Sequence, residues 1–112
     1  MAKKVTSHAT VSGVAAEKIK LNFKTAVYGF LDSVGIEKGS PARLRSAQLI
    51  NSVVVDLANK GRANPEHIAD LKTLIAANYS GSLNGAMGRI EKYAKENAEN
   101  IKEYIGPNSL LL

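Results

Sequence analysis

Apolar and polar positions follow a helical period in four segments of this chain, and the clearest segment lies between residues 40 and 61. On a helical wheel of about 100° per residue, one narrow stripe of this segment is polar: Arg45, Gln48, Ser52, Asp56 and Asn59. Most of the remaining circumference is apolar: Leu44, Ala47, Leu49, Ile50, Val53, Val54, Val55, Leu57 and Ala58. A helix that is apolar over more than half of its surface is covered by neighbours on several sides. We therefore predict that residues 41–60 form the core helix of the domain.

Both ends of this segment carry signals of a helix boundary. Ser40 can cap the free amides of the first turn, and Pro41 suits the first helical position, where no N–H partner is needed. Gly61 follows Lys60 and supplies a left-handed stop, with a cation in the last turn. These signals favour a helix over the alternative, a buried strand over residues 49–57, which its β-branched residues would also suit.

One polar residue, Asn51, falls inside the apolar sector of this helix. A buried asparagine must find hydrogen-bond partners and can then specify register or an oligomer interface. We expect Asn51 to lie at the edge of the sector instead, where water can satisfy its amide.

The three other periodic segments predict helices that pack around the central one. The first runs from about residue 13 to 34 and has the buried stripe Ile19, Phe23, Ala26, Val27, Phe30, Leu31 and Val34. The next begins at the cap signal Asn64-Pro65 and runs to about residue 79. The last, about residues 86–104, has the stripe Met87, Ile90, Ala94, Ala98, Ile101 and Ile105. The fold class is therefore all-α, a compact four-helix domain arranged as an up-down bundle or an orthogonal variant.

The two ends of the chain lack this period. Residues 1–12 are small, polar and β-branched, and predict a flexible arm that is basic through Lys3 and Lys4. Residues 106–112 end in Leu110, Leu111 and Leu112. Burying one leucine is worth about 1.5–3 kcal/mol, so this apolar tail either folds back onto residues 13–105 or docks on a neighbouring subunit. The second alternative predicts a homo-oligomer.

Length and composition narrow the class of protein. A chain of 112 residues corresponds to one domain. It contains no cysteine, which excludes disulfides, thiolate catalysis and cysteine-ligated zinc. The longest uncharged stretch, residues 74–88, is broken by Asn, Ser and Gly, and no secretory signal is visible. We expect a soluble protein, cytoplasmic or associated with a virion.

The basic residues are concentrated in the first part of the chain. The net charge is +5, made up of +6 over residues 1–62 and −1 over residues 63–112. Such an asymmetry suits an acidic partner, of which nucleic acid is the commonest. An ordinary solvated surface is the alternative explanation.

The first predicted phosphate site lies at the start of the helix over residues 41–60. In an up-down topology the loops at 35–40 and 80–85 lie at the same end. That end would gather Lys38, Gly39, Ser40, Arg43 and Arg45 with Ser80, Ser82, Asn84 and Arg89. Free amides at a helix start favour anions. Two arginines in a first turn are unfavourable next to the positive end of the helix dipole, and a bound phosphate would offset this repulsion. Alternatively, Arg43 and Arg45 reach water or a carboxylate such as Glu37.

A second basic group, Lys60 and Arg62, is expected at the opposite end, near Lys3 and Lys4. Motifs of nucleotide binding, zinc proteases and serine hydrolases are absent from the sequence. We therefore expect no catalytic residue, metal, cofactor or small-molecule substrate.

These observations favour a non-catalytic, self-associating structural protein of packaging, coat or architectural type. It would bind the nucleic-acid backbone with little sequence preference, through Lys3, Lys4, Lys38, Ser40, Arg43, Arg45, Lys60 and Arg62. The tail of Leu110, Leu111 and Leu112 would supply subunit contacts. The alternative is a small helical module, an adaptor or inhibitor, that binds another protein.

Overall fold

The central helix expected from the sequence is present in the computed structural model as α2 (Pro41–Lys60), and the other elements pack around it. The structure describes residues 2–105, with side chains from residue 16 onward. The remaining helices are α1 (Ala2–Ser33), α3 (Pro65–Asn78), α4 (Leu83–Glu96) and the three-residue α5 (Ala98–Asn100), followed by a π-helical turn, η1 (Ile101–Ile105). The described residues contain no strand. The all-α prediction is confirmed, and the alternative of a strand over residues 49–57 is wrong.

The expected boundaries of α2 are present, but one of them works differently from the prediction. Gly61 adopts a φ of 76°, and its N–H donates to the Leu57 carbonyl at 3.0 Å, as a left-handed stop requires. Ser40 occupies the N-cap position, yet its side chain caps no amide. Its hydroxyl donates instead to the Glu37 carbonyl at 2.8 Å. The capping prediction for Ser40 is wrong because its hydroxyl closes the preceding turn.

The starts of α3 and α4 are capped by side chains. The Asn64 Oδ1 accepts from the Glu66 amide at 2.9 Å, as the sequence predicted. The Ser82 Oγ accepts from the Gly85 amide at 3.0 Å, so α4 begins three residues earlier than expected. α4 ends at Glu96, before Asn97, whose side-chain amide donates to the Tyr93 carbonyl. The chain then continues through α5 and η1 rather than as one helix to residue 104.

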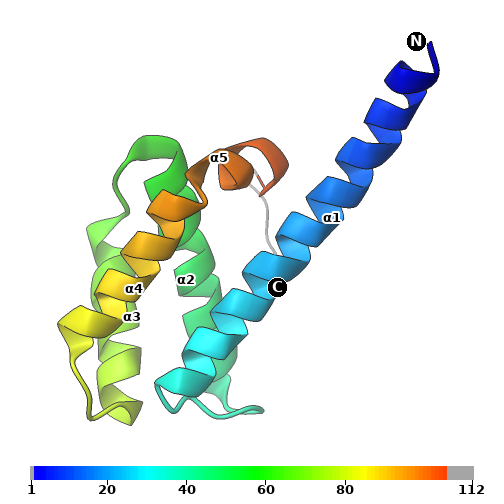
Figure 1. Cartoon of the computed structure of the whole chain (residues 1–112). Helices are drawn as coiled ribbons and strands as arrows, with labels where there is room; N and C mark the ends of the chain where they lie inside the picture. The colour runs from blue at the N-terminus through cyan, green and yellow to red at the C-terminus, as the bar shows by residue number, and fades with distance from the viewer. Residues whose placement is uncertain (1, 106–112) are drawn as a thin grey trace.

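Successive helices alternate in direction, so the loops before α2 and before α4 lie at the same end of the molecule (Figure 1). Two contacts join the elements near this end. A Cβ added to Gly35, whose φ of 78° already favours glycine, would lie 3.2 Å from the Asn78 carbonyl oxygen. Arg89 of α4 donates to the Ser33 Oγ of α1 at 3.1 Å. Both loops therefore lie at one end of the molecule, while an up-down four-helix bundle stays a prediction.

α1 differs most from the sequence prediction, because it begins at Ala2 rather than near residue 13. Residues 2–12, which we expected to form an arm without helical structure, belong to the helix. They contain no proline or glycine that would interrupt a helix. Each residue added to an existing helix gains one backbone hydrogen bond without the cost of starting a new helix. Figure 1 shows this N-terminal part of α1 extending beyond the other helices. The division of the chain at residues 12 and 105 stays a prediction.

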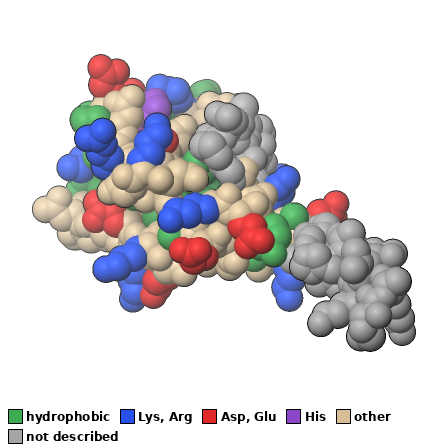
Figure 2. Space-filling model, turned by 90° about the horizontal axis from the view of Figure 1, so that it is seen from above, with side chains coloured by type: hydrophobic (Ala, Val, Ile, Leu, Met, Phe, Trp, Pro, Cys, Tyr) green, Lys and Arg blue, Asp and Glu red, His purple; other side chains and the backbone are tan. Residues whose placement is uncertain are grey.

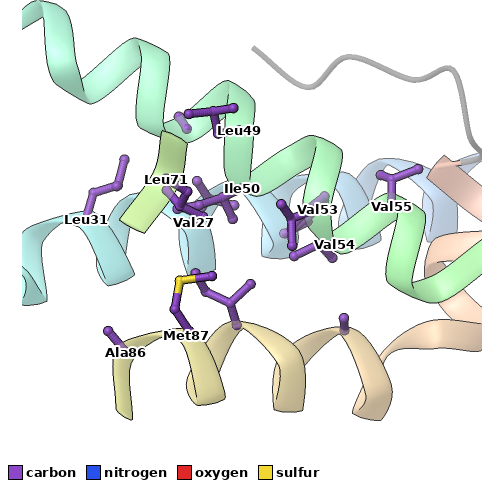
Figure 3. Packing of buried hydrophobic residues seen from close by; sticks show 14 of the residues in the cluster. Val27, Leu31, Leu49, Ile50, Val53, Val54, Val55, Leu71, Ala86 and Met87 are labelled. Carbon is purple, nitrogen blue, oxygen red and sulfur yellow. The ribbon is translucent and has the colours of Figure 1, made fainter. Parts of the chain in front are cut away.

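The hydrophobic core is built on α2, with α1, α3, α4 and η1 around it (Figure 3). Most stripe residues expected from the period are buried, including Phe23, Leu31, Ile90 and Ile101. Two positions on α2 differ from expectation: Leu44 is 52% exposed, and Asn51 is only 4% exposed. Asn51 therefore lies inside the core rather than at its edge. The wheel identifies the faces of a helix, but not which faces receive a neighbour.

Candidate functional site

Arg43, which we expected to bind phosphate, is buried at the junction of α1 and α2. Its Nη1 donates to the Asp32 Oδ1 at 2.7 Å and to the Ile36 carbonyl at 2.8 Å. Its guanidinium lies 4.9 Å from the centre of the Tyr28 ring. The Arg43 side chain is thus engaged in contacts with α1 and with the loop before α2. This corresponds to the alternative that Arg43 pairs with a carboxylate, although the carboxylate is Asp32 and not Glu37.

The other predicted residues at this end do not converge on one point. Arg45 is exposed, and its Nη2 lies 3.5 Å from the Asp70 Oδ2 of α3. The Ser40 hydroxyl is bonded to the Glu37 carbonyl. Lys38 is exposed and forms no ion pair with the described residues. Lys38, Ser40 and Arg45 thus lie near the same end of α2, with Ser40 bonded within its own loop and Arg45 beside Asp70.

The basic residues predicted at the opposite end have acidic side chains near them. The Lys60 Nζ lies 3.7 Å from the Asp56 Oδ1, one turn away on the same helix, and Arg62 is exposed in the following loop. Figure 2, which looks onto this end, shows Lys and Arg side chains interspersed with Asp and Glu side chains. Lys3 and Lys4 lie on the projecting part of α1, and their side chains lie outside the described part of the structure. Leu110, Leu111 and Leu112 also lie outside it.

Three lysines of α1 that were not among the predicted site residues are also exposed. Lys18, Lys20 and Lys24 are all exposed, and none forms an ion pair within the described residues. In the sequence, Lys20 and Lys24 align with Glu17 on one face, a pattern that is also typical of an ordinary solvated helix. Periodicity alone therefore gave no reason to select these lysines.

The described residues form a cleft between α1 and α4, with α2 at its base. Its volume is about 290 Å³, and its lining residues are Phe23, Ala26, Val27, Gly29, Phe30, Ser33, Ile50, Val54, Arg89, Ile90 and Tyr93. At one end the Phe23 and Tyr93 rings stack with centroids 5.8 Å apart, and burial raises the pKa of the Tyr93 phenol. At the other end Arg89 lies 4.9 Å above the Phe30 ring. Of these lining residues, Arg89 was already a candidate site residue from the sequence, but the sequence did not predict the cleft, because the lining residues come from three helices.

Neither a metal-binding cluster nor a membrane-spanning helix is present in the part of the chain that the structure describes. The described residues include no cluster of three His, Asp or Glu side chains that could hold a metal ion. Each helix in the described range is too short or too polar to cross a lipid bilayer. Comparison of this chain with protein-family models, with curated proteins and with solved structures finds no match.

Proposed function

We propose that this chain is a non-catalytic structural protein on a four-helix framework, which self-associates and holds nucleic acid through the phosphate backbone. The observation that supports this proposal best is the length of α1. A helix of 32 residues is about 48 Å long at 1.5 Å per residue, and the longest extent of the molecule is 56 Å. α1 therefore presents a long surface that the shorter helices do not cover.

The charge of α1 suits a polyanion. It carries Lys3, Lys4, Lys18, Lys20 and Lys24 against Glu17 and Asp32, and Asp32 is already paired with Arg43. Lysines without carboxylate partners gain most by neutralising phosphates, since they release the counterions held by the nucleic acid. Lys38, Arg45, Lys60 and Arg62 remain secondary contacts in this proposal, and Arg43 is omitted because its side chain is buried and paired.

The projecting part of α1 supports self-association. Residues 2–15 are rich in Val, Thr and Ser, which have low helix propensity. The first turn contains no acidic residue, and its lysines oppose the helix dipole. A helical segment of weak helix formers gains most of its stability by packing against other structure. A second copy of α1 would supply that packing, and the leucines at 110–112 stay a predicted further contact.

We expect binding to random-sequence duplex DNA that weakens steeply between about 50 and 200 mM salt, by about threefold for each phosphate contact. The test variant, Lys18→Gln/Lys20→Gln/Lys24→Gln, should bind more weakly and show a shallower salt dependence. Fluorescence anisotropy with two unrelated DNA sequences measures both quantities.

A matched variant, Lys92→Gln/Lys95→Gln/Lys102→Gln, removes the same charge from exposed positions of α4 and η1 and should retain the binding of the unmodified protein. Equal weakening by the two variants would show that only net charge matters and would contradict an interface on α1. Absence of binding at the lower salt would discard nucleic acid and favour the alternative, a module that binds another protein.

Self-association predicts that the mass measured by light scattering rises with protein concentration. Removal of residues 2–12 should abolish this rise while the circular dichroism of the remaining helices persists, because the core begins near Ile19. As a control, the variant with three glutamines on α4 and η1 should assemble like the unmodified protein. A monomer at all concentrations with α1 intact would contradict this part of the proposal.

A further inference from the structure

The cleft between α1 and α4 has an apolar floor and a cationic mouth. Val27 of α1 and Ile50 and Val54 of α2, all labelled in Figure 3, line it and are buried. Phe23 and Tyr93 close one end by stacking. At the other end lies Arg89, which is exposed and therefore accessible to a ligand. The cleft thus changes from apolar to charged along its length.

Arg89 and Arg43 have similar surroundings in this molecule, but Arg89 has no carboxylate partner among the described residues. Both guanidinium groups lie 4.9 Å from an aromatic ring of α1, Tyr28 for Arg43 and Phe30 for Arg89. Arg43 also pairs with a carboxylate, Asp32, at 2.7 Å. Arg89 donates only to the neutral Ser33 hydroxyl and forms no ion pair within the described residues. A carboxylate is the group that would complete the same arrangement at Arg89, and the planar guanidinium can bind it through two hydrogen bonds.

The size of the cleft limits what it can hold. An apolar cavity of about 150 Å³ in another protein binds benzene, a molecule of six carbons. The volume of this cleft, about 290 Å³, is small for a protein ligand site. By this comparison it suits a ligand about twice as large as benzene. A helix of a partner protein would not fit inside the cleft, because its diameter with side chains is about 10–12 Å.

We propose that the cleft between α1 and α4 binds a free medium-chain monocarboxylate, with its carboxylate on Arg89 and its alkyl chain along Phe30, Val27 and Ile90. The chain ends against the Phe23–Tyr93 pair. A chain of about eight to ten carbons matches the volume. This binding site is independent of the nucleic-acid contacts proposed for α1.

Gly29 allows the cleft to be blocked without disturbing the fold. It lines the cleft, and a Cβ added to it would meet no atom within 4 Å. Leucine is also the better helix former of the two residues, so Gly29→Leu should fill the cleft while the protein remains folded. Gly88 of α4 has equally open surroundings and is not among the lining residues. Gly88→Leu is therefore a matched control.

The test measures binding of octanoate, decanoate and 1-octanol to the full chain by calorimetry, with the fold of each variant checked by circular dichroism. We expect the unmodified protein and Gly88→Leu to bind both carboxylates. Gly29→Leu should lose the binding of all three compounds. Arg89→Gln should weaken the binding of the carboxylates by about tenfold or more, as expected for a lost charge-assisted hydrogen bond, and should leave 1-octanol unchanged.

Three results would overturn the proposal. The first is no binding of either carboxylate to the unmodified protein at millimolar concentration. The second is unchanged binding by Gly29→Leu, which would place the ligand elsewhere. The third is equal weakening of octanoate and 1-octanol in Arg89→Gln, which would show that Arg89 does not recognise the charge.

Discussion

Replacement of Leu49 by alanine is expected to lower the free energy of unfolding by about 2–5 kcal/mol. Leu49 is 2% exposed and belongs to the core that α2 organises. Truncation removes the transfer free energy of the lost methyl and methine groups. It also leaves a cavity that the neighbouring helices fill only in part. Urea denaturation followed by circular dichroism measures the change, with the slope of the transition used to verify that both proteins unfold in the same manner.

The same substitution at Leu44 is the control, since it lies on the same helix and changes helix propensity equally. Leu44 is 52% exposed, so Leu44→Ala should change the free energy of unfolding by only about 0.5 kcal/mol or less. The hydrophobic pattern places both leucines in the apolar sector and does not distinguish them. Equal destabilisation by the two variants would show that Leu44 is covered in solution and would contradict the packing of α2.

Replacement of Arg43 by alanine is expected to lower the free energy of unfolding by about 2–3 kcal/mol. The largest part comes from the Ile36 carbonyl, which loses the guanidinium that donates to it; a buried polar group left unpaired costs about 1–3 kcal/mol. Loss of packing against Tyr28 adds to this. Asp32 contributes less, because its side chain is 57% exposed and water can solvate the carboxylate once Arg43 is gone.

Arg45→Ala is the matched control for this prediction. Its ion pair with Asp70 spans 3.5 Å between two side chains that are both more than half exposed, and such surface pairs contribute about 0–1 kcal/mol. We expect a change of about 0.5 kcal/mol or less, measured by the same urea transition. If Arg43→Ala were as mild as Arg45→Ala, the buried arrangement around Arg43 would be wrong. Arg43 would then return to the set of candidate phosphate ligands.

Several features of the fold could be predicted because they depend on residues close together in the chain. The α2 boundary at Gly61 and the cap of α3 by Asn64 depend on backbone conformation and hydrogen bonds within four residues. The helical period identified most of the core positions for a similar reason. The cap at Ser40 failed because two local hydrogen bonds compete for the same hydroxyl, and the sequence does not determine which one forms.

The candidate sites could be predicted only in part. Arg43 and Arg45 stand two positions apart near the start of α2 and carry the same charge, so the sequence predicted the same role for both. Arg43 points toward α1 and is buried by Asp32 and Tyr28, whereas Arg45 points toward α3 and remains exposed. The cleft at Arg89 needs α1, α2 and α4 together, and no pattern within one segment indicates it.

The sequence by itself determined the all-α class, the position of the central helix, the buried stripes and the excess of positive charge in the first part of the chain. These properties follow from residue identity and from interactions within one or two helical turns. Only the tertiary structure decided that Leu44 is exposed, that Asn51 is buried, that Arg43 is paired and that α1 extends beyond its neighbours. The physical reason is that burial and pairing depend on which helix faces meet, and those contacts join residues far apart in the chain.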